Sequence, residues 1–151
     1  MVDKALAEFV LAHEQDIRRA VVETRAKANS RTGGGSSSHC YVSDPTATEA
    51  IRNVTEVIQI SVEYGPRGLY GREKKKIKYP ERWLKVIAWT KEYYNGQGRE
   101  EQAKIYAARF THKQDRETIC QDMNMKHGRY HAAVNDILAF ATGVAIGLGI
   151  N

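Results

Sequence analysis

The chain has 151 residues, a mass of 17.0 kDa and a formal net charge of +5, from 23 basic and 18 acidic side chains. This length predicts one compact domain or two small sub-domains and excludes a multidomain enzyme. Two cysteines that lie eighty positions apart exclude a disulfide framework, and no apolar stretch reaches the roughly 20 residues of a membrane span. The first ten residues, MVDKALAEFV, lack a signal-peptide profile, so we expect a cytoplasmic protein.

The N-terminal region, residues 1–64, is predicted to be helical and carries a net charge of −2. Apolar residues recur at three- and four-residue steps from Leu6 to Thr24, which predicts one amphipathic helix of about six turns that ends near Ala28. The segment NSRTGGGSSS at residues 29–38 has no apolar side chain and predicts a flexible loop. A second helix is expected to begin at Ser43-Asp44-Pro45-Thr46, with Ala50, Ile51, Val54, Val57 and Ile58 as its apolar face.

The middle of the chain holds the excess of positive charge. Residues 65–98 have a net charge of +6, and a run of lysines follows the turn-forming sequence Gly65-Pro66-Arg67-Gly68. This pattern predicts a mobile basic linker loop over residues 65–80, between two helical halves. Its candidate phosphate-binding side chains are Lys74, Lys75, Lys76 and Lys78. The alternative is a linker whose lysines serve only solubility.

A third helix is expected after Pro80 and should end at the Asn95-Gly96-Gln97-Gly98 turn. Trp83, Ile87 and Tyr94 share one face, so we expect them to be buried, whereas Trp89 should face outward. Aromatic side chains near a basic segment also suit stacking on single-stranded nucleic acid, but their helical spacing favours the core.

The C-terminal domain, residues 81–151, contains the most specific pattern of the chain. After a helix marked by Ala103, Tyr106, Ala107 and Phe110, a short helix over 116–123 is followed by the turn 124–126 and a long helix from His127. This spacing is typical of a helix-turn-helix. Asn124 holds the turn position that glycine usually takes, and asparagine tolerates the left-handed backbone there. The positions predicted to be buried are Ile119, Cys120, Met123, Met125, Tyr130, Ala133 and Val134.

The outward face of the long helix carries the candidate DNA-reading side chains. They are Lys126, His127, Arg129, His131 and Asn135, with Arg116 placed to bind a phosphate. These residue types include the donors that read guanine and adenine edges in a major groove. Lys126 stands where serine or threonine usually caps the helix, and Gly128 lies in its first turn, so we expect a loosened helix start. The alternative is a helical hairpin with no role in DNA binding.

The sequence GGGSSSHCYVSDPTATEAI, together with a C-terminal helix-turn-helix, resembles the RinA/ArpU-type phage late-transcription regulators. The resemblance spans most of the chain and rests on Ser43-Asp44-Pro45-Thr46 with Ala50, and on last helices that are similar to the promoter-reading region 4 of sigma factors. It implies an all-α fold, double-stranded DNA and host RNA polymerase as partners, the host bacterial cytoplasm as location, and activation of phage late genes near a promoter. It also implies that the same five residues, Lys126, His127, Arg129, His131 and Asn135, would contact the DNA, with Arg116 on a phosphate.

Other function classes have less support in the sequence. A small-terminase-like DNA-packaging protein and a helical protein-interaction module remain alternatives. We expect no enzyme, cofactor or metal: His127 and His131 lie four apart without an evident third ligand, and Cys40 lacks the partners of a catalytic thiol. The apolar end of the last helix, residues 137–148, is predicted either to pack on the N-terminal helices or to form a homo-oligomer through Gly143 and Gly147.

Overall fold

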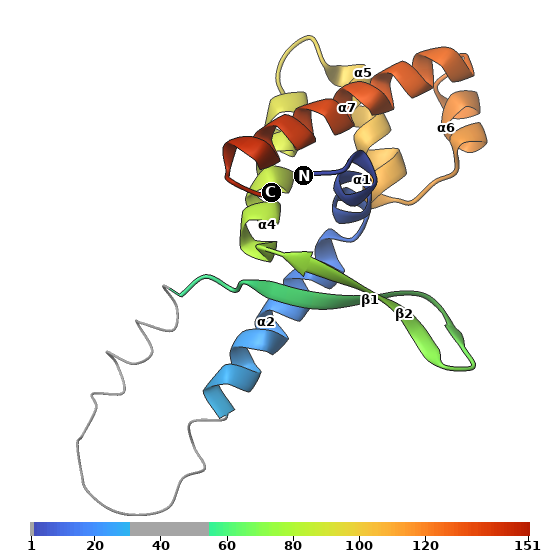
Figure 1. Ribbon diagram of the computed structural model, residues 1–151. Helices are drawn as coiled ribbons and strands as arrows, with labels where there is room; N and C mark the ends of the chain where they lie inside the picture. The colour runs from blue at the N-terminus through green and yellow to red at the C-terminus, as the bar shows by residue number, and fades with distance from the viewer. Residues whose placement is uncertain (1, 31–54) are drawn as a thin grey trace, which may run out of the picture. The chain divides into compact units, whose positions relative to one another are not determined.

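The computed structural model describes residues 2–30 and 55–151 (Figure 1). The chain divides into two compact units. Unit 1 comprises Met1–Glu14 and Arg82–Asn151, and unit 2 comprises Gln15–Glu81. The first residues of the chain therefore belong with the C-terminal helices. Residues 31–38 of the predicted glycine-serine loop and the predicted helix start at residues 43–46 lie outside the described residues, whereas residues 29 and 30 of that predicted loop end a helix.

Two helices form at the N-terminus, where the sequence predicted one. Helix α1 spans Lys4–Ala12 and α2 spans Glu14–Ser30. His13 separates them with φ −120° and ψ 30°, and its backbone N–H donates to the carbonyl of Val10 at 3.2 Å. The prediction of one continuous helix was wrong because the apolar spacing continues through this single non-helical residue.

The prediction of an all-α fold was also wrong, because unit 2 contains an antiparallel β-hairpin. Strand β1 spans Gln59–Gly68 and β2 spans Gly71–Lys78. The predicted basic linker loop over residues 65–80 instead forms the end of β1, the turn, all of β2 and the first residue of the following helix. Alternate residues Ile60, Val62 and Ile77 are buried, and this period of two is the strand signal that the lysine run obscured. Val57 and Ile58, expected in a second helix, instead lead into β1.

Charged and backbone contacts fix the base of the hairpin in unit 2. Glu81 forms an ion pair with Arg25 of α2 and accepts the backbone N–H of Val57 at 3.0 Å. The backbone N–H of Tyr79 donates to the carbonyl of Ile58 at 2.7 Å. The open ends of both strands are therefore held together beside the start of the next helix.

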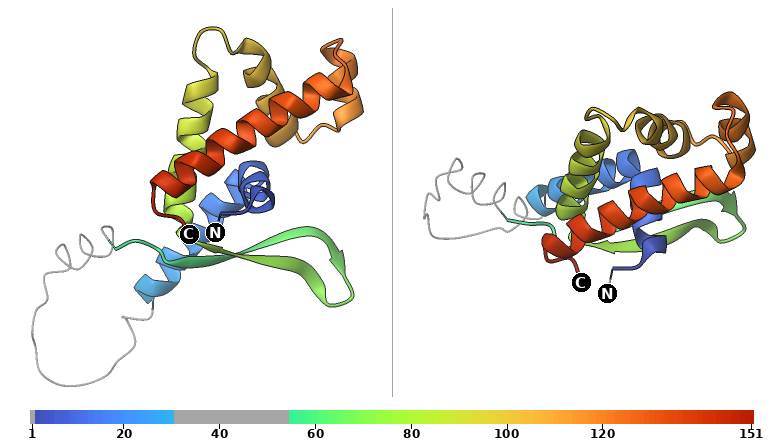
Figure 2. Two further views of the ribbon diagram at one scale, coloured as in Figure 1. Left: turned by 45° about the horizontal axis from the view of Figure 1, so that its top comes forward. Right: turned by 90° about the horizontal axis from the view of Figure 1, so that it is seen from above.

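The helices of unit 1 follow in quick succession, and Figure 2 shows them from two further sides. They are α4 Pro80–Tyr94, α5 Glu100–Tyr106, the π-helical turn η1 Ala107–Thr111, α6 Arg116–Asp122 and α7 His127–Gly147. The predicted helix after Pro80 is confirmed, with Trp83, Ile87 and Tyr94 buried and Trp89 half-exposed. The predicted succession of three further segments is confirmed as well.

The core of unit 1 forms where α1 packs against α7 (Figures 1 and 2). Ile137, Leu138, Ala141 and Ala145 of α7 are buried, which confirms that the apolar end of the last helix packs back on the N-terminus. An ion pair joins Glu8 of α1 to Arg109 of η1, and Arg109 also donates to the hydroxyl of Tyr130 on α7. Within residues 2–30 and 55–151, no helix has both the length and the hydropathy needed to cross a membrane.

Candidate nucleic-acid interface

Helices α6 and α7 are joined by the turn that the sequence predicted. Asn124 has φ +49°, so it adopts the left-handed backbone, and the backbone N–H of Met125 donates to the carbonyl of Cys120 at 2.9 Å. Ile119, Cys120 and Tyr130 are buried as expected. Met123 and Met125 are only half-buried, because they lie at the edge of the contact between the two helices. The geometry of the turn thus follows from local backbone preferences.

The left-handed backbone at Asn124 should make stability depend on the residue at this position. Substitution Asn124→Ala should lower the free energy of unfolding by about 1 kcal/mol, because a Cβ without a polar group to offset the strain disfavours this conformation. Asn124→Gly is the matched control and should cost nothing, since glycine adopts positive φ freely. Chemical denaturation of the three proteins measures the difference, and equal stability of the alanine and glycine variants would contradict it.

Asp115 is the N-cap of α6. Its carboxylate accepts the hydroxyl of Thr118 and, at 3.4 Å, the backbone N–H of the same residue. The hydrogen bond from the Thr118 hydroxyl and then that from its backbone N–H lower the pKa of Asp115. Both bonds stabilise the ionised carboxylate at the positive end of the helix dipole.

This lowered pKa predicts a loss of stability in acid. Because the folded protein holds the carboxylate ionised, the cap stabilises α6 fully above the ordinary aspartate pKa, and its contribution is lost as the pH falls through the lower folded value. Asp115→Asn keeps a capping side chain without the charge. Thermal melts between about pH 2 and 6 should therefore show a steeper loss for wild type than for the variant. If the melting temperatures of the two proteins fell in parallel with pH, protonation of Asp115 would not be coupled to folding.

Helix α7 begins without a side-chain cap. Lys126 occupies the N-cap position with φ −79° and ψ 151° and makes no capping hydrogen bond, and Gly128 has open space around its Cα. The missing side-chain cap agrees with the sequence, while the loosened helix start stays a prediction. The small residue also allows another backbone to approach the first turn of α7 closely.

All five candidate DNA-reading residues are exposed, but they do not form one row. His127, His131 and Asn135 lie four residues apart, so they make a single stripe along α7. Arg129 lies about 200° around the helix from His127 and His131. Between the two flanks, Gly128 and Ala132 are exposed and small. If α7 lay in a major groove, the small residues would allow a close approach to the groove floor, and the longer side chains of the two flanks could reach base edges on either side.

Arg129 is held by a partner that the sequence analysis did not identify. Its Nε donates to Glu101 Oε1 at 2.9 Å and its Nη2 to Oε2 at 2.6 Å, while the Arg129 side chain stays 68% exposed. Glu101 lies on α5, so the pair connects two helices that also pack on each other. No spacing rule links residues 28 positions apart, and the pairing depends on the tertiary fold.

The other flank of α7 adjoins the start of α6. Arg116 and His131 line a shallow hollow of about 360 Å³ together with Arg109, Tyr130, Asp115 and Glu117. The fold therefore brings the predicted phosphate ligand Arg116 near one of the predicted base-reading residues. Asp115 and Glu117 also line this hollow, and their negative charges lower its attraction for a phosphate.

The predicted phosphate-binding lysines lie in unit 2. Lys74, Lys76 and Lys78 alternate along β2 and share one face of the hairpin, whereas Lys75 lies on the opposite face. Lys74 pairs with Glu63 of β1 at 3.2 Å. These residues form a basic strand where the sequence predicted a basic loop.

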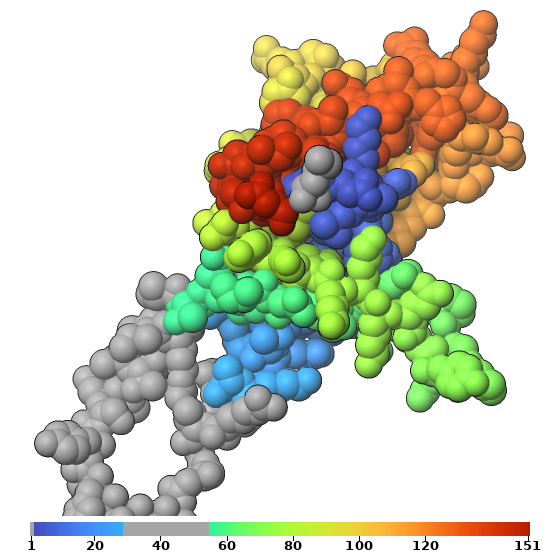
Figure 3. Space-filling view, in the orientation of Figure 1, coloured from blue at the N-terminus to red at the C-terminus, as the bar shows by residue number. Residues whose placement is uncertain are grey.

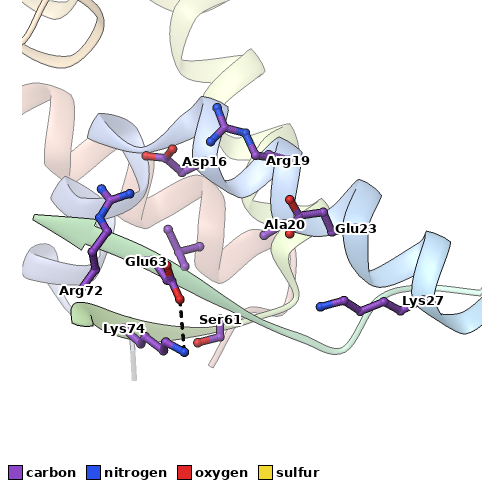
Figure 4. A pocket seen from close by; sticks show the side chains of 10 residues that line it. Asp16, Arg19, Ala20, Glu23, Lys27, Ser61, Glu63, Arg72 and Lys74 are labelled. Carbon is purple, nitrogen blue, oxygen red and sulfur yellow. Dashed lines mark ion pairs between the residues drawn. The ribbon is translucent and has the colours of Figure 1, made fainter. Parts of the chain in front are cut away.

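Unit 2 also contains a hollow of about 320 Å³ between α2 and the hairpin. Figure 4 shows its side chains, among them Asp16, Arg19 and Glu23 of α2 and Arg72 and Lys74 of β2. Acidic and basic groups alternate around this hollow, so it presents no single sign of charge to a ligand. Among the described residues, no group of three histidine, cysteine or acidic side chains is placed to hold a metal ion.

Comparisons with protein-family models, curated proteins and solved structures found no match to this chain.

Proposed function

We propose that the protein binds double-stranded DNA in a sequence-dependent manner, with α7 as the recognition helix. The observation that carries the proposal is the exposed N-terminal half of α7. There Lys126, His127, Arg129, His131 and Asn135 surround the small residues Gly128 and Ala132, on a helix fixed against α6 by the turn at Asn124. Such a surface fits a major groove, where arginine pairs with guanine and asparagine with adenine.

The pair between Arg129 and Glu101 supports a reading role for the arginine. A guanidinium carries five N–H donors, and Glu101 engages Nε and one hydrogen of Nη2. The remaining hydrogens on Nη1 and Nη2 form the fork that matches O6 and N7 of guanine. Glu101 thus holds the plane of the guanidinium in place and reduces the entropy that Arg129 loses on binding a base.

The biological role proposed here follows from the resemblance to RinA/ArpU-type regulators. In it, the protein acts in the host bacterial cytoplasm and activates phage late genes by binding near a promoter with host RNA polymerase. Deletion of the protein should then lower late transcripts while early transcripts persist. Unchanged late transcription would leave DNA binding in place but exclude this role.

The lysines of β2 are expected to contribute affinity without sequence preference. The triple variant Lys74→Gln, Lys76→Gln and Lys78→Gln should weaken binding to all duplexes alike and flatten the salt dependence by somewhat less than one unit per lost phosphate contact. Lys85→Gln, an exposed lysine on α4, is the control. Titration of a fluorescent duplex at several salt concentrations measures the slope, and an unchanged slope would remove the hairpin from the interface.

A further inference from the structure

The hairpin of unit 2 ends in two apolar side chains that are almost fully exposed. Leu69 is 93% and Tyr70 99% exposed, and they form the turn between the paired residues Gly68 and Gly71. Gly71, the first residue after the turn, has φ +93°, a backbone conformation that glycine adopts without steric strain. Figure 3 shows the end of the hairpin projecting beyond the body of α2. Folding of the chain does not require either side chain to be apolar.

The part of the hairpin next to this turn makes an exposed arm. From Gly65 to Lys74 every residue is exposed, while burial begins further down, at Val62 and Ile77. About four residues of each strand thus extend beyond the buried base, or roughly 13 Å. Arg72 donates to the carbonyl of Gly65 at 2.9 Å, across a register shift between Tyr64 and Gly68. This contact connects the two strands within the arm.

The charge of the hairpin indicates its partner. Residues 59–78 carry six basic and two acidic side chains, and the basic residues continue from the turn to the base of β2. Two-stranded β-ribbons bind DNA through either the major or the minor groove, and basic side chains on such a ribbon can follow the phosphates. Two apolar residues are too small for a stable protein interface, which buries about 800 Å² on each partner, but they are the size of a wedge that enters a base step.

We propose that the hairpin is a DNA-bending arm. Its basic strand binds phosphates, and Leu69 and Tyr70 enter the minor groove and partly unstack one base step, which kinks the duplex. The inference rests on the proposed function only in that duplex DNA is the partner, and it does not require base reading by α7. Contacts of the lysines with the bent DNA offset the cost of unstacking, as in other proteins that insert apolar side chains.

The test measures DNA bending by the full-length protein. A 30-bp duplex with a central TA step, labelled at its ends with a donor and an acceptor fluorophore, reports the end-to-end distance by energy transfer. Wild type should raise the transfer efficiency on binding. The double variant Leu69→Ser and Tyr70→Ser should bind within about tenfold of wild type, since its phosphate contacts remain, yet leave the duplex straight. Val22→Ser, an exposed residue of α2, is the control and should bend DNA like wild type.

The outcomes separate this inference from the proposed function. The double variant Leu69→Ser and Tyr70→Ser is called the turn variant below. Both proposals stand if Arg129→Ala loses sequence preference but still bends DNA, and the turn variant keeps sequence preference but does not bend DNA. Bending by the turn variant equal to that of wild type overturns the bending arm and leaves base reading untouched. Loss of bending in the turn variant, with sequence preference retained by Arg129→Ala, supports the arm and removes the assigned role of α7. A third result would assign the arm to a membrane surface and overturn the proposal. In that case wild type does not bend DNA but binds vesicles with 30% anionic lipid, and the turn variant loses this vesicle binding.

Discussion

Substitution Arg129→Ala is expected to weaken binding to the preferred duplex by about 1–3 kcal/mol, which is roughly five- to 150-fold in affinity. The same variant should bind unrelated duplexes almost as well as wild type. The reason is that Arg129 is an exposed fork donor paired with Glu101. Under the proposed function, its loss removes a base contact and only one positive charge. Competition titrations with preferred and unrelated duplexes measure the two affinities.

Two further variants distinguish base reading from a structural ion pair. Arg129→Lys keeps the charge but loses the planar fork, so it should restore non-specific binding without restoring preference. Glu101→Gln should reduce preference while it slightly strengthens non-specific binding, because it releases the guanidinium and removes a negative charge. An equal loss of affinity on every sequence after Arg129→Ala would refute the reading role.

Substitution Tyr130→Ala is expected to lower the free energy of unfolding by about 3–5 kcal/mol, the range for removal of a fully buried aromatic side chain. Tyr130 has no exposed surface, lies at the start of the α7 core and accepts a hydrogen bond from Arg109. Its loss leaves a cavity beside α6 and detaches α7 from the network that reaches Glu8 of α1. DNA binding should fall with the fraction of folded protein.

The conservative variant separates packing from the hydrogen bond. Tyr130→Phe keeps the ring and should cost only about 1 kcal/mol, because Arg109 retains its pair with Glu8. Urea denaturation of the three proteins gives the comparison. If Tyr130→Ala lowered the free energy of unfolding by less than about 1.5 kcal/mol, packing of α7 would not depend on this aromatic ring.

The helices of unit 1 could be predicted because their signals are local. Pro80 begins α4, Asp115 caps α6, and Asn124 supplies the left-handed turn residue before α7. Each of these features depends on the backbone preference or hydrogen bonding of residues within one turn. The same helical period also predicted the exposure of five side chains, Lys126, His127, Arg129, His131 and Asn135.

The hairpin could not be predicted in the same way. Four of the eight residues of β2 are lysines, so Ile77 is its one buried apolar residue and no alternation is visible in the sequence. Its partner Ile60 lies 17 positions earlier in the chain, on β1. Strand pairing of this kind depends on contacts that a local pattern does not contain. The pair between Arg129 and Glu101, which positions the most important candidate side chain, depends on tertiary packing for the same reason.

The most direct test of the account is selection of bound sequences from a random 30-bp duplex library by the purified full-length protein, with wild type and Arg129→Ala run in parallel. The account predicts that wild type enriches one motif with a conserved guanine, and that Arg129→Ala loses enrichment at that guanine while it still retains duplexes at low salt. Selection of no motif by wild type, or of the same guanine by both proteins, would contradict it.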